Sequence, residues 1–283
     1  MRSPLKSVAV LFNPKLPAAR ELSLALRKLM AGRGIEVSVC EFRREDESIS
    51  CLAQPTDLIV TLGGDGTLLH TAHFAAVPGI PVLGVNLGKL GFLCDLGPDH
   101  VLEEIPPYLD GKCQVEERLM LQVTHLRDGV EVSCSHALND AVVGHASVSS
   151  IVRIQASVNG NHLTTFAADG VIVATPSGST AYSFAAGGPI VHPADEHILL
   201  TPISPHKPRF GSFVAPPHAV IRLDVEGSSQ AVLSVDGQPE MPVQDGDIVE
   251  VRESPYKTRL LRRDSERYFF QALRATLKYG LEP

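Results

Sequence analysis

The stretch Thr61–His70, TLGGDGTLLH, places three glycines and one aspartate directly after an apolar run. Glycine-rich turns at such positions commonly hold phosphate, because bare backbone N–H groups can close on the oxygens. A carboxylate repels a phosphate unless a metal ion lies between them or the acid takes a proton from an attacking hydroxyl. The spacing of Gly63, Gly64, Asp65 and Gly66 therefore indicates phosphoryl chemistry, with Asp65 as the candidate catalytic group.

Two familiar phosphate-binding motifs do not fit this chain. The nearest match to Gly-x4-Gly-Lys-Ser/Thr, GVNLGKL from Gly84 to Leu90, is one residue short and lacks the hydroxyl. Leu69 stands where the third glycine of the dinucleotide fingerprint belongs. A plainer interpretation stays open for this stretch alone: Asp65 or Thr67 caps a helix, and the glycines only make a tight turn.

A second stretch, Ala168–Pro189, reads ADGVIVATPSGSTAYSFAAGGP and is rich in small and hydroxyl-bearing residues. Its hydroxyls offer donors and acceptors without bulk, Tyr182 offers an aromatic face, and Asp169 offers the one charge. The hydroxyl-bearing residues are Thr175, Ser177, Ser179, Thr180 and Ser183. Such a segment suits a nucleoside, and the alternative is a Ser/Gly-rich surface loop.

The two stretches together resemble one family. GGDGT after an apolar strand resembles the signature shared by NAD kinases and by diacylglycerol and sphingosine kinases and, as GGDGS, phosphofructokinases. The Ala168–Pro189 segment resembles the NAD kinase motif nearly throughout, and the lipid kinases and phosphofructokinases lack it. ALND at Ala137–Asp140 and SVDGQ at Ser234–Gln238 resemble two further NAD kinase elements. The resemblance runs from about residue 57 to about residue 240.

This resemblance implies that ATP or polyphosphate phosphorylates the 2′-hydroxyl on the adenosine ribose of NAD, giving NADP. A divalent metal, Mg²⁺, would arrive on the donor phosphates, and no protein metal site is expected. Asp65 would accept the hydroxyl proton or help place the metal, and Lys89 or histidines could add positive charge. The residues implied to contact nucleotide are Gly63, Gly64, Gly66, Thr67, His70, Asn139, Asp140, Asp169, Ser177, Thr180, Ala181, Tyr182, Ser183, Ala185 and Gln238.

Several positions leave alternatives open. Asp140 stands where the family usually has Glu, so its ribose contact would need a small backbone shift or a water. Ala167 replaces a residue that is often polar, which leaves the choice between NAD and NADH undecided. His70 can face the nucleotide or simply pack, and with His73 it has metal-pair spacing but no third ligand nearby in sequence. The rival functions are a lipid or sugar kinase and a non-catalytic NAD-binding sensor.

The bulk composition narrows the class of protein. The 283 residues, 44% hydrophobic, can fill a sizeable core, and the net charge of −7 gives no basic footprint for nucleic acid. No apolar run approaches the roughly 20 residues of a membrane span. Five cysteines without a CxxC pair suggest neither a disulfide framework nor a zinc site, which favours a cytoplasmic protein. By resemblance, we expect a homodimer or homotetramer.

Alternating strand and helix patterns must position the first stretch. Strands are predicted at 7–12, 36–42, 57–62 and 81–85, with helices over 16–30 and 67–76 and a charged link at 43–50. This order predicts a parallel sheet. From residue 117 the pattern changes to short strands, and a helix returns at 264–279. We therefore predict an α/β Rossmann-like domain (1–112 and 258–283), an all-β, β-sandwich-like domain (113–257), and an active site in the crevice between them.

Overall fold

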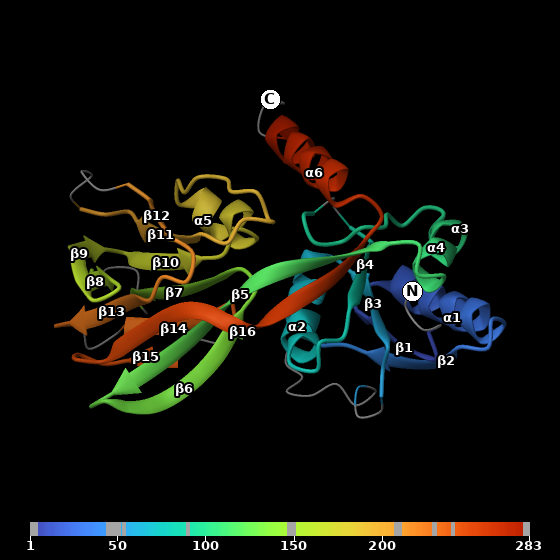
Figure 1. Ribbon diagram of the computed structural model, residues 1–283, viewed down its shortest axis with the longest axis horizontal. Coiled ribbons are helices and arrows are strands. Elements are labelled where there is room, and N and C mark those ends of the chain that lie inside the picture. The colour runs from blue at the N-terminus through green and yellow to red at the C-terminus, as the bar shows by residue number, and fades with distance from the viewer. Residues whose placement is uncertain are drawn as a thin grey trace. The chain divides into compact units, whose positions relative to one another are not determined.

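The computed structural model describes residues 5–43, 52, 55–88, 91–145, 151–206, 211–227, 231–238 and 241–279 (Figure 1). The chain divides into two compact units, Met1–Arg118 with Lys257–Pro283, and Leu119–Tyr256. Two long strands, β5 (Gln114–Arg127) and β16 (Ile248–Arg262), run from one unit into the other.

The first unit is built on a parallel sheet. Its strands are β1 (Ser7–Phe12), β2 (Glu36–Glu41), β3 (Leu58–Gly63), β4 (Val82–Asn86) and the end of β16. They lie in the order β2-β1-β3-β4-β16, and β16 joins through the parallel pair Leu260 and Val82. Because β3 and β4 are buried throughout, their side chains form the apolar runs that identify a covered parallel sheet.

Two helices connect these strands by crossovers that run in opposite directions along the sheet. Helix α1 (Pro17–Ala31) leads from β1 to β2, and α2 (Asp65–Ala76) leads from β3 to β4. Since such crossovers are right-handed, the two helices cover opposite faces of the sheet. The strand order therefore reverses between β1 and β3, and the carboxyl end of β3 lies at this switch point. Ligands of open α/β sheets bind at such points.

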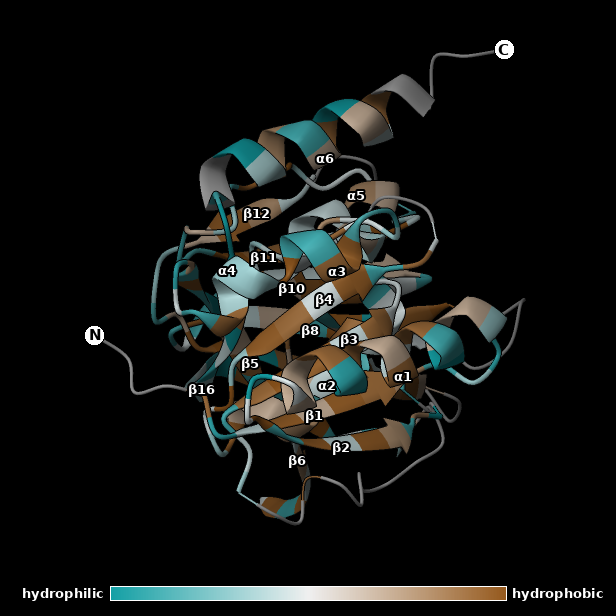
Figure 2. Cartoon of the chain, turned by 90° about the vertical axis from the view of Figure 1, so that its right-hand side faces the viewer, coloured by the Kyte–Doolittle hydropathy of each residue, from teal (hydrophilic) through white to brown (hydrophobic). Residues whose placement is uncertain are grey.

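The core of the first unit joins the sheet to α1 and to two short helices. Leu26 and Met30 of α1 pack on the buried residues of β1, β3 and β4 together with α3 (Val101–Glu104) and α4 (Pro106–Leu109). The hydropathy colouring shows brown along these strands and mixed teal and brown on α1 (Figure 2). Helix α6 (Ser265–Tyr279) belongs to the same unit, with Phe269 and Ala272 buried.

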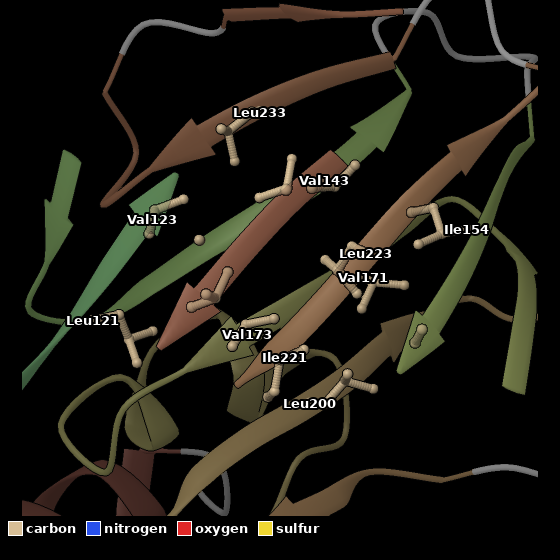
Figure 3. Packing of buried hydrophobic residues seen from close by; sticks show 14 of the residues in the cluster. Leu121, Val123, Val143, Ile154, Val171, Val173, Leu200, Ile221, Leu223 and Leu233 are labelled. Atoms are coloured by element: carbon tan, nitrogen blue, oxygen red, sulfur yellow. The ribbon is translucent and has the colours of Figure 1, made fainter. Parts of the chain in front are cut away.

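The second unit is a sandwich of antiparallel strands. One layer contains β8 (Val152–Val158), β9 (Asn161–Ala168), β13 (Ile221–Glu226), β6 (Val130–Ala137) and parts of β5 and β16. The other has the order β12-β11-β10-β7-β14-β15. Its strands are Phe213–Ala215, Ile198–Ile203, Gly170–Ala174, Asp140–His145, Ala231–Val235 and Met241–Val243, respectively. Leu121, Ile154 and Leu223 of the first layer meet Val143, Val173 and Leu233 of the second (Figure 3).

The Ala168–Pro189 stretch leaves this sandwich at the end of β10. It forms the short 3₁₀ helix η2 (Gly178–Thr180) and then α5 (Tyr182–Ala185). Thus the apolar half of the stretch is a buried strand, and the hydroxyl-rich half is a compact pair of helical turns.

The structure confirms the predicted fold class, an α/β unit and a strand-rich unit with a C-terminal helix in the first. Helix α2 begins at Asp65 and not at Thr67, because the glycine turn ends earlier than its composition suggests. The predicted link at 43–50 falls almost wholly outside the described residues. Within the described part of the chain, no helix is long and apolar enough to cross a membrane.

The cysteine prediction needs one correction. Cys40 on β2 is disulfide-bonded, whereas Cys94, Cys113 and Cys134 are in the reduced, thiol form. Spacing alone did not reveal this bond, because cysteines without a CxxC pattern can still meet in the fold.

Candidate functional site

The glycine-rich turn lies at the switch point of the parallel sheet. Gly63 ends β3, Gly64 is the extended N-cap of α2, and Asp65, Gly66 and Thr67 form the first turn of that helix. A Cβ on Gly63 would lie 2.2 Å from Thr67 Oγ1, whereas one on Gly66 would meet nothing within 4 Å. Gly63 is thus required for packing, and Gly66 leaves open space over the helix N-terminus.

The Asp65 carboxylate does not cap its own helix. Its Oδ2 accepts the N–H of Phe92 at 2.6 Å, and its Oδ1 accepts those of Leu93 at 3.1 Å and Cys94 at 3.3 Å. The helix N-cap is Gly64, and the Asp65 carboxylate binds N–H groups of another segment, so the capping interpretation does not describe Asp65. Three backbone N–H groups therefore fix the two carboxylate oxygens, and the Cys94 side chain is a further hydrogen-bonding neighbour.

The segment opposite Asp65 is shaped for this contact. A Cβ on Gly91 would lie 2.3 Å from the Asp65 carboxyl carbon, so only glycine allows the approach. Burial, and next the Asp65 charge, raise the pKa of the Cys94 thiol well above its usual value. Cys94 is therefore a neutral neighbour of the acid and not a second anion. On β4, the buried Asn86 accepts the N–H of Gly88 at 2.9 Å through Oδ1.

His70 lies one turn further along α2. Its ring packs against Phe42, with ring centroids 5.0 Å apart, and against Phe74, at 5.4 Å. These contacts fit the packing alternative, and a nucleotide contact by His70 remains a prediction. Lys89, the candidate for added positive charge, lies outside the described residues.

In the second unit a buried acid fixes the Asn139–Asp140 turn. Asp236 accepts the N–H groups of Leu138 at 2.7 Å, Asn139 at 2.8 Å and Asp140 at 2.9 Å. Asp236 has a left-handed backbone (φ 49°), which turns its side chain back under this segment. The turn therefore presents Asn139 and Asp140 from a fixed backbone.

Asp140 itself is 6% exposed. Burial, and then the Asp236 charge, raise the pKa of the Asp140 carboxyl to about 7. Hydrogen-bond donors to this carboxyl would lower its pKa, because they favour the charged form.

The hydroxyls of the Thr175–Ser183 stretch mostly bond within the protein. Thr175 Oγ1 donates to Leu138 O at 2.5 Å, Ser179 Oγ to Pro176 O at 2.6 Å, and Ser183 Oγ pairs with Thr201 Oγ1 at 3.1 Å. These three side chains are fully buried. Their first function is to hold the turn, and a direct nucleotide contact by Ser183 stays a prediction.

The remaining predicted residues of this unit differ in their exposure to solvent. Tyr182 is 45% exposed on α5 beside Ala181 and Ala185, while Ser177 is buried just before η2. Thr180 Oγ1 donates to Ser177 O at 3.2 Å. Asp169, between β9 and β10, lies 3.8 Å from His145 Nε2. The backbone of Gln238 accepts Ser234 Oγ at 3.0 Å. The stretch thus has an anchored base and an accessible aromatic ring.

The described residues contain no group of three His, Cys, Asp or Glu side chains that could hold a metal ion. In the first unit a pocket of about 560 Å³ opens beside α6. Its lining is Asp95, Leu96, Glu104, Tyr108, Arg263, Asp264, Arg267, Tyr268 and Gln271, none of which the sequence predicts to contact nucleotide.

The sequence pattern assigned no role to Gly91, or to Asp236 within the SVDGQ element. An Asp-Gly pair is a common turn, so only the fold reveals that Asp236 holds the Asn139–Asp140 segment. The position of Asp236 and Gly237 directly after the apolar strand β14 was the one sequence feature that could have indicated this role. No local pattern indicated that residues 92–94 would bind Asp65.

The fold is that of a nucleotide-binding protein whose α/β unit carries its polar turn where open sheets receive ligands. Comparison narrows this class: the model of the ATP-NAD kinase N-terminal domain matches residues 9–113, and that of the C-terminal domain matches residues 138–263. The chain belongs to the ATP-NAD kinase family. The sequence-based prediction of an NAD kinase, a phosphotransferase, is therefore confirmed.

Curated relatives and solved structures are similar to this chain over nearly its whole length. The NAD kinase of Heliobacterium modesticaldum is 40% identical over 283 residues, which cover 98% of this chain and 100% of its own. That of Dehalococcoides mccartyi is 37% identical over 274 residues, 96% of each chain. The yeast NADH kinase complexed with NADH superposes with a TM-score of 0.84 at 26% identity, covering 100% of this chain and 90% of that one. The Archaeoglobus fulgidus NAD kinase in complex with ATP superposes with a TM-score of 0.76 at 26% sequence identity. The match covers 95% of this chain and 99% of that one.

Proposed function

We propose that this chain transfers the terminal phosphoryl group of ATP or polyphosphate to the 2′-hydroxyl on the adenosine ribose of NAD. The observation that carries the proposal is the Asp65 carboxylate at the switch point, which three backbone N–H groups hold in a fixed position. In this role Asp65 accepts the proton of the attacking hydroxyl. Catalysis then consists mainly of positioning and charge neutralisation.

The donor phosphates would lie at the first turn of α2. Gly66 leaves open space there, and the free N–H groups of a helix N-terminus favour anions. Mg²⁺ would come bound to these phosphates and balance their charge, since the described residues offer no preformed cluster for it.

The acceptor nucleoside would bind the second unit. Asp140 accepts the ribose hydroxyls through its buried carboxyl, Asn139 adds an amide, and Tyr182 offers a stacking face. Because Asp140 is one methylene shorter than the family's usual Glu, this contact would need a small backbone shift or a bridging water. The exposed Ala167 makes both NAD and NADH reasonable acceptors.

The decisive variant is Asp65→Asn. It keeps the shape of the side chain and removes the base, so turnover to NADP should fall by about 10²–10⁴-fold while calorimetry still detects NAD binding. Asp57→Asn is the matched control, since Asp57 also accepts backbone N–H groups, from Lys6 at 2.7 Å and Ser7 at 2.9 Å.

A non-catalytic NAD-binding sensor would bind NAD and show no turnover in the unaltered protein. Full activity in Asp65→Asn would show that Asp65 takes no part in the phosphoryl transfer. Running the same assay with NAD or NADH, and with ATP or polyphosphate, identifies the preferred pair of substrates.

We further propose that the protein is cytoplasmic and forms a homodimer or a homotetramer. Light scattering of the purified protein measures the size of the oligomer.

A further inference from the structure

The segment that binds Asp65 is held from its other side by the C-terminal part of the chain. The Tyr268 hydroxyl, on α6, donates to the carbonyl oxygen of Gly91 at 2.8 Å, from 177 residues away in sequence. Arg262 Nη2, at the end of β16, donates to the carbonyl oxygen of Phe92 at 3.0 Å, from 170 residues away. Both contacts lie within the first unit.

These two carbonyls belong to the peptide groups that Asp65 uses. The Gly91 oxygen and the Phe92 N–H are the two ends of one planar peptide group, and the Phe92 oxygen and the Leu93 N–H are the ends of the next. Tyr268 therefore binds the oxygen of the group whose N–H binds Asp65 Oδ2. Arg262 does the same for the group that binds Asp65 Oδ1.

A donor at the oxygen of a peptide group strengthens the hydrogen bond made by its N–H, because the group becomes more polarised. It also fixes the plane of the group, and therefore the direction in which the N–H points. Two consecutive peptide groups with a donor on one side and the same carboxylate on the other form a rigid support. Without these donors, the N–H groups could turn away from the acid.

Arg262 is itself firmly held. Its side chain is 1% exposed, Nε donates to Glu116 Oε2 at 3.0 Å, and Nη1 donates to Asp95 Oδ1 at 3.4 Å. Burial opposes its charge, but Asp95 and then Glu116 outweigh burial and raise the pKa of the guanidinium above its usual value. The guanidinium carbon lies 4.5 Å from the centre of the Tyr268 ring, which links the two donors.

Tyr268 is a permanent donor. Burial raises the pKa of its phenol well above its usual value, although the Arg262 charge acts in the opposite direction. The hydroxyl therefore keeps its proton at any pH at which the protein would work. The neighbouring Phe269 ring contacts Phe92, with centroids 6.2 Å apart, and adds an apolar contact to the same segment.

We propose that Tyr268 and Arg262 are positioning residues for Asp65, acting through the peptide groups Gly91–Phe92 and Phe92–Leu93. The inference rests on the proposed role of Asp65 in phosphoryl transfer. It makes the C-terminal helix part of the support of the reacting centre. Loss of the Tyr268 hydroxyl should slow turnover without weakening substrate binding, since the helix would act on the base and not on the ligand.

Each peptide group can be observed singly in the full-length protein. The sequence contains one Gly–Phe pair, Gly91–Phe92, and one Phe–Leu pair, Phe92–Leu93. Carbonyl-¹³C glycine with ¹⁵N phenylalanine therefore gives one correlated resonance, and carbonyl-¹³C phenylalanine with ¹⁵N leucine gives another. These resonances report the hydrogen bonds of the two groups independently of activity.

For Tyr268→Phe we expect the Gly91 carbonyl and Phe92 amide resonances to move upfield, with a smaller change at Phe92–Leu93. We expect kcat to fall about five- to tenfold, as for the loss of one hydrogen bond, with KM for NAD and ATP within about twofold of the unaltered protein. Arg262→Lys should mainly move the Phe92–Leu93 resonance. Tyr256→Phe, at a tyrosine of the second unit that contacts His136, is the matched control and should change neither signal nor kcat.

Two results for Tyr268→Phe would overturn the positioning role: resonances that do not move, or resonances that move while kcat is unchanged. A thermal melt checks that the variant is folded. Asp65→Asn separates this failure from failure of the proposed function. If it moves both resonances but keeps full kcat, Asp65 has no part in the chemistry and the positioning role falls with it. Moved resonances together with lost turnover in Asp65→Asn, and a slower Tyr268→Phe, support both.

Discussion

Asp236 controls Asp140 in two ways. Its backbone N–H donates to the Asp140 carbonyl oxygen at 2.9 Å, and its carboxylate accepts the Asp140 N–H at 2.9 Å. Its charge adds to burial in raising the pKa of the Asp140 carboxyl to about 7. The same residue thus fixes where Asp140 lies and how readily it ionises. A bound nucleoside that donates hydroxyls to Asp140 would favour the ionised form.

The raised pKa predicts a specific pH dependence of stability. Folded Asp140 keeps its proton up to about pH 7, whereas in the unfolded chain it loses it near pH 3.8, so the free energy of unfolding falls as pH rises between these values. Above pH 7 the loss is complete, at roughly 4 kcal/mol as an upper limit. Asp140→Asn removes this loss, and urea unfolding should therefore find it more stable than the unaltered protein at pH 8.

The comparison at low pH provides the control. At pH 4 the two proteins should unfold at similar urea concentrations, since Asp140 is then neutral in the folded state. Equal stability at pH 8 would show that the folded carboxyl ionises without cost. Asp140→Asn should also weaken NAD binding at either pH, because the amide accepts only one of two ribose hydroxyls well.

The glycines of the phosphate turn provide a pair of opposite predictions. An alanine Cβ at Gly63 would lie 2.2 Å from Thr67 Oγ1 and 2.7 Å from Thr67 Cβ, with Thr67 only 8% exposed. Gly63→Ala should therefore cost about 1–3 kcal/mol of stability through overpacking. Thermal or urea unfolding of the variant measures this loss.

Gly66→Ala should separate stability from function. Its Cβ meets nothing within 4 Å, and alanine is the better helix former by about 1 kcal/mol. We expect equal or higher stability, together with a raised KM for ATP if donor phosphates occupy that space. An unchanged KM would place the phosphates elsewhere.

The sequence predicts most of the fold because its local signals agree with its tertiary packing. The expected strand at 7–12 is β1 without change, and the buried runs after residues 57 and 81 became β3 and β4, since apolar β-branched segments between turns have few alternatives. The start of α2 was misplaced because glycine and aspartate favour turns, and the helix N-terminus overrode that preference.

The site was predictable by residue type but not by contact. Asp65 was predicted as the catalytic group, yet its partners are the backbone N–H groups of residues 92–94. Because every residue except proline carries such a group, residue types could not indicate which ones bind Asp65. In the same way Ser179 was counted among the hydroxyls that suit a nucleoside and Ser183 was expected to contact the nucleotide. Both are fully buried and bonded within the protein, and the contact by Ser183 stays a prediction. A hydroxyl in a small-residue segment serves equally well as a ligand contact or as an internal brace, and only the fold decides between them.

The close packing of Gly178 against the backbone of Asn139 gives a prediction for the second unit. A Cβ on Gly178 would lie 2.1 Å from the Asn139 carbonyl oxygen and 2.6 Å from its carbonyl carbon, and backbone atoms cannot move aside cheaply. Gly178→Ala should cost about 3 kcal/mol or more, or displace the Asn139–Asp140 turn and reduce NAD affinity. Urea unfolding and calorimetry together detect either result. Gly211→Ala, with nothing within 4 Å, is the matched control and should behave as the unaltered protein.

Tyr182 and Phe184 form the last matched pair, on the single turn of α5. Both rings are partly exposed, at 45% and 39%, so their removal should change stability by less than about 1 kcal/mol. If the Tyr182 ring stacks on the nucleobase, Tyr182→Ala should weaken NAD binding by about 1–3 kcal/mol, or about 5- to 150-fold in Kd. Phe184→Ala should leave Kd unchanged, since alternate residues of one turn point in different directions. Equal losses in the two variants would indicate that the turn as a whole, and not the tyrosine ring, recognises the nucleoside.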